Sequence, residues 1–159
     1  MKIKIFALTH KKFEVPQDKM YQPLQVGREE KEDLGYLCDN TGDNISAENC
    51  YYSELTGLYW IWKNVHTYKY VGTCHYRRYL LNEQEKIFTE AEYLELLKDY
   101  DLITTKRVVL NNSYHYGFAT NHNIHALDMT GEVIKELYPE YYDTFVQLVN
   151  GTETYFGNM

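Results

Sequence analysis

The stretch YVGTCHYRRYL, residues 70–80, begins as an apolar strand and ends in a cationic cluster. Its first half has the branched and aromatic side chains that are typical of β-strands. Its second half places His75, Arg77 and Arg78 directly after the strand, in a chain whose formal net charge is −7. Ligands of open α/β sheets bind beyond the carboxyl ends of the strands, so this cluster predicts a binding edge.

A second strand is predicted near the start of the chain. The apolar run IKIFAL, residues 3–8, is typical of a buried parallel strand. The polar segment 9–44 contains two prolines and three glycines, and we expect a long ordered loop with one short strand at YQPLQVG, residues 21–27. Such long loops in compact domains are usually functional or disordered.

The segment NISAENCYYSELTGLYWIWKNV, residues 44–65, predicts one long helix with Ser46 as its N-cap. Glu54 lies off the apolar stripe of this helix, so it lies either on a solvated face or beside the ligand cleft. The stripe recurs at helical spacing and consists of Tyr51, Leu55, Leu58, Trp62 and Val65.

The remaining segments alternate between the two types of secondary structure. The predicted strands are 68–74 and 101–110, and the predicted helices are 88–100 with Thr89 as N-cap, 124–138 and 140–151; residues 111–122 are read as a polar loop. This alternation predicts an α/β fold in which helices flank a mostly parallel sheet. We expect a single domain over residues 1–159.

Composition limits the possible partners and the compartment. The acidic balance, with a pI near 5.3, disfavours nucleic acid and anionic lipid as partners. Three cysteines without metal-ligand spacing indicate reduced thiols. No signal peptide or membrane-spanning run is present, so we expect a cytoplasmic protein with at most peripheral association at the inner face of the membrane.

Three predicted strands end in cationic residues. Thr9, His10 and Lys11 follow the first strand, His75 to Arg78 follow the strand at 68–74, and Lys106 and Arg107 follow residues 101–105. Guanidinium and ammonium groups bind phosphate oxygens, so this pattern predicts a phosphorylated ligand. The alternative is that Arg77 and Arg78 pair with nearby carboxylates such as Glu83 and Glu85. No glycine-rich phosphate fingerprint follows the first strand, which argues against a Rossmann dehydrogenase or a P-loop enzyme.

A second group of polar residues lies between residues 115 and 128. His122, His125 and Asp128 are spaced as on one helical face, and His115 lies upstream. Such a face binds a metal, lines an acceptor site or is purely structural, and the spacing alone does not choose among these roles. Asp128 is the best candidate for a general base, because a carboxylate is what deprotonates an acceptor hydroxyl in sugar transfer.

Several of these segments, in order, resemble a bacterial family of glycosyltransferases. That family has long been catalogued as a domain of unknown function and occurs in capsular and exopolysaccharide gene clusters. The resemblance covers essentially the whole chain, and its most specific part is ELTGLYWIWKN followed by HYRRYL. The other segments are THKKFEVP, LGYLCDNTGDN, DLITTKR, YHYGFATNH, LYPEYYDTF and YFGNM.

The resemblance implies a GT-A-like, Rossmann-like fold, a nucleoside-diphosphate sugar as donor and a glycan or lipid-linked acceptor. The strand after the ELTG-type helix of GT-A enzymes ends in an Asp-x-Asp motif that holds a divalent metal, and here the segment 75–78 takes that place. We therefore expect cationic side chains to neutralise the diphosphate, with no certain cofactor and no metal ligands assigned. The family pattern continues past Met159, so we expect its C-terminal part to be absent.

The sequence and this resemblance thus predict a glycosyltransferase of cell-surface polysaccharide synthesis, and we expect its donor to be uridine-based. Thr9, His10 and Lys11 are expected to border the nucleotide, and His75, Arg77 and Arg78 to hold the diphosphate. His75 and Asp128 are the candidate catalytic residues, and His122, His125 and Asp128 form the acceptor side. The alternative is a non-catalytic module that binds a nucleotide-sugar or a glycan.

Overall fold

The computed structural model describes residues 2–155, which divide into two compact units. The first unit ends at Thr104 and the second begins at Thr105, and each is described by itself. Residues 156–159, which form most of the quoted segment YFGNM, lie outside the described residues.

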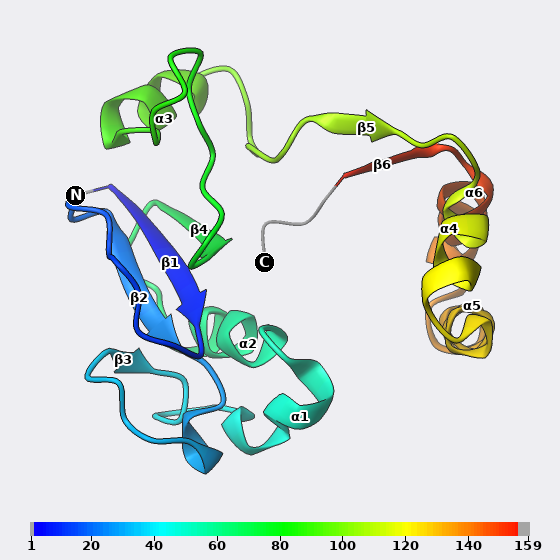
Figure 1. The fold of residues 1–159 in the computed structure, drawn as a ribbon, viewed down its shortest axis with the longest axis horizontal. Helices are drawn as coiled ribbons and strands as arrows, with labels where there is room; N and C mark the ends of the chain where they lie inside the picture. Colours follow the sequence, from blue (N-terminus) through cyan, green and yellow to red (C-terminus); the bar gives the residue numbers. More distant parts are fainter. Residues whose placement is uncertain (1, 156–159) are drawn as a thin grey trace. The chain divides into compact units, whose positions relative to one another are not determined.

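The first unit is built on a four-stranded parallel sheet with the order β3-β2-β1-β4 (Figure 1). Its strands are β1 (Ile3–Thr9), β2 (Tyr21–Gln25), β3 (Leu37–Cys38) and β4 (Tyr70–His75). The predicted strands at 3–8, 21–27 and 68–74 are thereby confirmed, as is the mostly parallel α/β class. The loop predicted over 9–44 also contains β3 and the short 3-10 helix η1 (Arg28–Glu30).

The helix predicted over residues 44–65 is broken into three pieces. These are the 3-10 helix η2 (Ser46–Glu48), α1 (Asn49–Tyr52) and α2 (Leu55–Asn64). The break lies at Ser53, whose φ of 50° and ψ of −128° are incompatible with a continuous helix. The prediction of one helix is therefore wrong, and Ser46 is not its N-cap, because the Ser46 hydroxyl donates to the carboxylate of Asp39.

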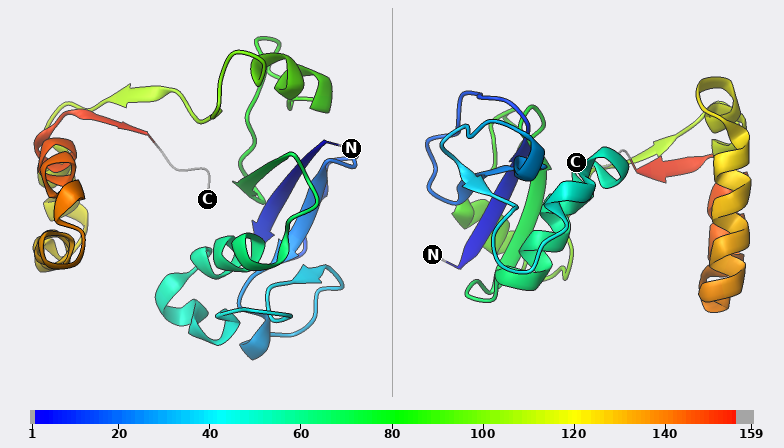
Figure 2. Two further views of the ribbon diagram at one scale, coloured as in Figure 1. Left: turned by 180° about the vertical axis from the view of Figure 1, so that it is seen from behind. Right: turned by 90° about the horizontal axis from the view of Figure 1, so that it is seen from below.

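The face of α2 that packs on the sheet is not the apolar stripe seen in the sequence. The buried residues of α2 are Thr56, Gly57, Trp60 and Ile61, while Leu55, Leu58 and Trp62 of the stripe are exposed. Gly57 explains this choice, because a Cβ there would lie 2.6 Å from Val26 Cγ1 and 3.0 Å from Leu8 Cδ2. Glycine lets the helix approach the sheet closely, and both panels of Figure 2 show α2 against the strands.

Asp39 joins the loops on this side of the sheet. Its carboxylate is fully buried and accepts hydrogen bonds from the backbone N–H groups of Gly27 (2.8 Å) and Arg28 (3.1 Å). It also accepts from the hydroxyls of Ser46 (2.6 Å) and Thr56 (2.7 Å). Because a buried carboxylate needs such partners, one side chain fixes the segments after β2 and β3 and the start of α2.

The chain leaves β4 through a turn at Asn82 and enters α3 (Glu90–Leu96). The Thr89 hydroxyl accepts from the Glu92 N–H, and the Glu92 carboxylate accepts from the Thr89 N–H, which forms a capping box. The prediction of Thr89 as N-cap is therefore confirmed. A hydrogen bond from the Tyr21 hydroxyl to the carbonyl of Phe88 (3.2 Å) links this region to β2.

The second unit combines a two-stranded antiparallel sheet with helices (Figure 2). Its elements are β5 (Arg107–Val109), α4 (Tyr114–Asn121), α5 (Ile124–Leu137), the 3-10 helix η3 (Pro139–Tyr141), α6 (Tyr142–Asn150) and β6 (Glu153–Tyr155). The predicted helices at 124–138 and 140–151 are confirmed. None of the helices described in either unit has the length and apolar character that crossing a membrane requires.

Two predictions for this unit are wrong. The expected strand 101–110 is a strand only from Arg107 to Val109, and it pairs with β6 rather than with the parallel sheet. The expected polar loop 111–122 contains α4, because Ser113 caps a helix by accepting from the Tyr116 N–H.

Replacing Asp39 tests its role as the joining residue. In Asp39→Asn, an amide N–H group would face donors that now meet a carboxylate, so the free energy of unfolding should fall by about 3 kcal/mol. Urea unfolding followed by circular dichroism measures this change. Asp99→Asn, at an exposed position in the same unit, is the control and should unfold like the wild type.

Two glycine substitutions should have opposite effects on stability. Gly57→Ala places a methyl group against Val26 and Leu8 and should destabilise the protein by about 1–3 kcal/mol. Gly117→Ala in α4 meets nothing within 4 Å and should stabilise it by about 0.5–1 kcal/mol. Equal thermal midpoints for the two variants would contradict the close packing of α2 on the sheet.

Candidate functional site

The carboxyl ends of β1 and β4 lie side by side in the sheet. Leu8 pairs with His75, and the Tyr76 N–H donates to the Leu8 carbonyl at 3.1 Å, so the two segments leave the sheet together. The Thr9 hydroxyl donates to the Lys11 carbonyl (2.6 Å) and accepts from the Lys11 N–H (3.0 Å). These two hydrogen bonds tie the buried Thr9 side chain to the backbone of Lys11 and so fix the turn in which His10 and Lys11 are exposed.

The ring of Tyr76 contacts side chains from both segments, the one after β1 and the one after β4. The His10 ring packs edge-on against Tyr76 with centroids 5.6 Å apart, and Phe13 lies at the same distance at a tilt. The Arg77 guanidinium carbon lies 5.1 Å from the centroid of the same ring, within the range of a cation–π contact. The structure thus brings His10 and Arg77 together on one buried aromatic residue, as the strand-end pattern predicted.

His75 is buried at the end of β4, and both of its ring nitrogens contact the protein. Its Nε2 lies 3.4 Å from Oε1 of Glu54, whose side chain is 24% exposed. Its Nδ1 accepts from the Arg77 N–H at 3.2 Å, and its carbonyl accepts from the Arg78 N–H at 2.8 Å. Of the two sequence readings of Glu54, the structure supports the one that places it at the site.

Arg77 and Arg78 are both exposed residues. Among residues 2–155, no carboxylate lies within ion-pair distance of either guanidinium group, so the predicted alternative of pairs with Glu83 and Glu85 does not occur there. We call His10, Lys11, Lys31, Arg77 and Arg78 the cationic edge.

Lys31 was not predicted as a member of the cationic edge, because it lies in the charge run REEKED, which is typical of a solvated face. Its ammonium donates to Asn49 Oδ1 at 2.7 Å, and its positive charge helps to lower the pKa of His10. No signal in the sequence pointed to this placement, which depends on the fold of the loop between β2 and β3.

Lys106 and Arg107 do not belong to this edge of the parallel sheet. They were expected there as the end of a third strand, but Arg107 begins β5 of the second unit. Its guanidinium pairs with the Glu153 carboxylate on β6 at 2.9 Å. The expectation of a third cationic strand end is therefore wrong, because the strand begins later and pairs in another sheet.

The charges of the cationic edge act on His10 and on the neighbouring His75. Burial is the main cause that lowers the pKa of His75, and Arg77, Arg78 and His10 lower it further, while the Glu54 carboxylate opposes them. Partial loss of water lowers the pKa of His10, with Lys11, Lys31 and Arg77 acting in the same sense. Both rings are therefore neutral near pH 7, and the positive charge of the edge comes from lysine and arginine.

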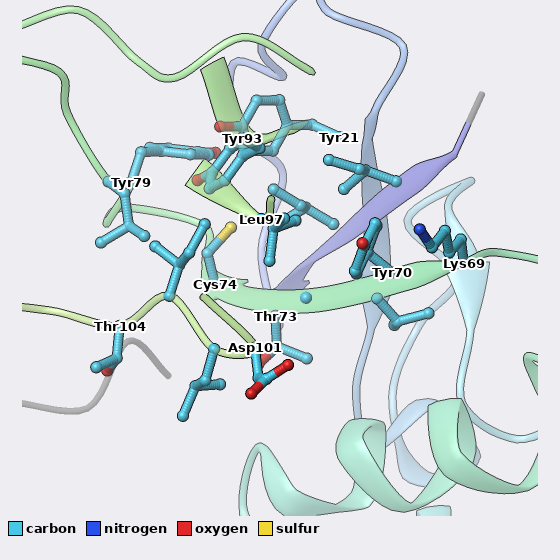
Figure 3. A pocket seen from close by; sticks show the side chains of 17 residues that line it. Tyr21, Lys69, Tyr70, Thr73, Cys74, Tyr79, Tyr93, Leu97, Asp101 and Thr104 are labelled. Atoms are coloured by element: carbon cyan, nitrogen blue, oxygen red, sulfur yellow. The ribbon is translucent and has the colours of Figure 1, made fainter. Parts of the chain in front are cut away.

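A cavity of about 500 Å³ lies along β4, apart from the cationic edge (Figure 3). Its wall is mainly aromatic and aliphatic and includes Tyr21, Tyr79, Tyr93 and Cys74. Burial raises the pKa of the Cys74 thiol to about 12, so this sulfur stays protonated. None of the strand-end residues predicted from the sequence lines this cavity. We therefore base the candidate site on the exposed cations and not on the size of this cavity.

The residues that the sequence predicted for an acceptor side belong to the second unit. Asp128 lies on α5 and lines a cavity of about 360 Å³ together with His115, Glu132 and Lys135. His125 is on the same helix, whereas His122 is the C-cap residue of α4, so the three do not share one helical face as expected. Neither His122 nor His125 lines this cavity. Among residues 2–155, no group of three His, Cys, Asp or Glu side chains has metal-site geometry.

Comparisons with known proteins agree with this architecture. The apo structure of a bifunctional glycosyltransferase, WbbM, superposes with a TM-score of 0.85 at 29% sequence identity. The match covers 100% of this chain and 33% of that one, so the chain spans about a third of the length of that protein. A search of curated proteins found no match. The model of the family described as "Domain of unknown function (DUF4422)" matches residues 4–159, and the chain therefore belongs to this family.

Proposed function

We propose that the protein is a glycosyltransferase that transfers a sugar from a nucleoside-diphosphate sugar to a glycan or lipid-linked acceptor. The observation that carries this proposal is the pair of exposed arginines, Arg77 and Arg78, at the carboxyl end of β4 beside the end of β1, neither of which has a carboxylate partner among residues 2–155. Ligands of parallel α/β sheets bind at this edge, and guanidinium groups suit diphosphate oxygens. The structural likeness to a bifunctional glycosyltransferase supports the same reaction class.

In this proposal the site residues have separate tasks. His10 and Lys11 border the nucleotide, for which we expect uridine, and Thr9 holds the turn that presents them. Arg77 and Arg78 bind the diphosphate and stabilise the negative charge that develops on it as the bond to the sugar breaks. The cationic side chains take the place of a metal held by an Asp-x-Asp motif, and we expect a GT-A type of donor binding.

The acceptor hydroxyl is deprotonated in the proposal by Asp128, if the reaction inverts the sugar's configuration. Asp128 lines a cavity in the second unit, where His115 and Lys135 supply polar groups beside it. His122 and His125 complete the proposed acceptor side. We further propose that this reaction is a step in capsular or exopolysaccharide synthesis. The protein would carry it out in the bacterial cytoplasm, at the inner face of the membrane.

Calorimetric titration with uridine diphosphate tests the donor site. Arg77→Ala should weaken binding by about tenfold or more, because it removes a charge-assisted contact to the diphosphate. Arg77→Lys should retain part of the affinity, since the charge stays and the fork geometry is lost. Lys86→Ala, in the turn between β4 and α3, is the matched cationic control and should bind like the wild type. Equal affinity for Arg77→Ala and the wild type would contradict the proposal.

A transfer assay separates the enzyme from the alternative of a non-catalytic binding module. Release of uridine diphosphate from the nucleotide-sugar is expected for the wild type and should fall by at least about 100-fold in Asp128→Asn, while uridine diphosphate binding persists. Activity that survives a chelator supports cationic neutralisation. Activity that disappears with a chelator and returns with Mn²⁺, while arginine replacements are harmless, would contradict it. Binding without turnover would favour the module.

A further inference from the structure

The turn after β4 places Arg77 and Arg78 at the proposed diphosphate site, and its geometry depends on the His75 ring. The Arg77 N–H donates to His75 Nδ1 at 3.2 Å, and the Arg78 N–H donates to the His75 carbonyl at 2.8 Å. The ring also lies against Tyr76, with centroids 4.3 Å apart, and Tyr76 in turn contacts the Arg77 guanidinium. The direction in which the two arginines leave the sheet therefore follows from the orientation of this ring.

The Arg77 contact determines the tautomer of His75. A nitrogen that accepts a hydrogen bond has no proton, so in the neutral ring the proton is on Nε2. This Nε2 is the atom that lies 3.4 Å from the Glu54 carboxylate. The partly buried carboxylate thus faces the N–H side of the ring and favours the tautomer that leaves Nδ1 free for Arg77.

Glu54 is itself held in place by the strained junction between α1 and α2. Ser53, directly before it, has a φ of 50°. Its carbonyl accepts from Asn49 Nδ2 (2.6 Å) and lies 3.1 Å from the Thr56 hydroxyl oxygen, and this hydroxyl donates to the buried carboxylate of Asp39 at 2.7 Å. Strain of this kind persists only where the surroundings enforce it, and it is often found beside functional residues.

We propose that Glu54 is a positioning residue, which holds His75 in one tautomer and orientation and thereby sets the turn that presents Arg77 and Arg78. Because Nδ1 accepts from the Arg77 N–H and Nε2 lies 3.4 Å from the Glu54 carboxylate, His75 acts in this proposal through the turn and not as a direct ligand of the phosphate. This inference deepens the proposed function and rests on it only for the identity of the ligand.

The pair makes the turn sensitive to pH. Protonation of His75 puts a hydrogen on Nδ1, so this atom can no longer accept from the Arg77 N–H. The groups that act on the ring are the Glu54 carboxylate, which favours the charged form, and Arg77, Arg78 and His10, which disfavour it along with burial. The turn should therefore be intact while the ring is neutral and should loosen as the pH falls through the depressed pKa of His75.

Nuclear magnetic resonance of the free protein tests the pair without any ligand. In the wild type, the His75 ring should show the Nε2–H tautomer, and the Arg77 amide signal should titrate with the same midpoint as the ring. Glu54→Gln keeps the size and removes the charge, so it should lower the pKa of His75 and move both midpoints together. Glu54→Ala should in addition shift the Arg77 and Arg78 amide signals near pH 7, and Glu83→Gln, at an exposed carboxylate, is the matched control.

Identical His75 and Arg77 titrations in the wild type, Glu54→Gln and Glu54→Ala would overturn the inference. The same variants are then titrated with uridine diphosphate, and Glu54→Ala should bind about tenfold more weakly, a loss typical of outer contacts that orient a ligand site. If the wild type does not bind uridine diphosphate, the proposed function fails. The nuclear magnetic resonance experiment would still decide whether Glu54 positions His75, because it needs no ligand. Weakened binding with unchanged spectra would instead make Glu54 a direct ligand and would also overturn the inference.

Discussion

Asp39 is buried, and no cation within residues 2–155 forms an ion pair with it; hydrogen bonds from two backbone N–H groups and two hydroxyls compensate its carboxylate. This one group sets the loop after β2, the 3-10 helix η2 and the first turn of α2. Through the Thr56 hydroxyl it also stabilises the Ser53 junction, from which Glu54 reaches His75. The path from Asp39 to the arginines after β4 is thus a continuous series of contacts within the first unit, and a buried polar network of this type tolerates little rearrangement.

The cationic edge is exceptional in a chain with a net charge of −7. Lysine and arginine gather beside the ends of β1 and β4, so the edge offers a local positive field to an anionic ligand. The two histidines add little charge near neutral pH because burial and neighbouring cations lower the pKa of each. An acidic surface combined with a cationic strand edge fits a phosphorylated small molecule better than nucleic acid, which would meet the repulsion of the whole surface.

The sequence predicted the elements that local patterns determine. β1 and β4 are marked by apolar runs, and α3 by its Thr89 capping box, so these were found correctly. The break at Ser53 was missed, because long-range bonds to Asp39 and the close approach at Gly57 override a helical pattern that is continuous in the sequence. For the candidate site, the sequence located the cationic residues directly after β1 and β4, whereas the contact of Glu54 with His75 and the place of Lys31 depend on tertiary structure.

The proposed function depends above all on Arg77 and Arg78, at the carboxyl end of β4, forming a diphosphate-binding site. A crystal structure of the protein with uridine diphosphate tests this proposal most directly. Diphosphate oxygens should lie within hydrogen-bond distance of the Arg77 or Arg78 guanidinium, and the nucleoside should lie beside His10 and Lys11. A nucleotide bound instead in the aromatic cavity along β4, with both guanidinium groups still in solvent, would contradict it.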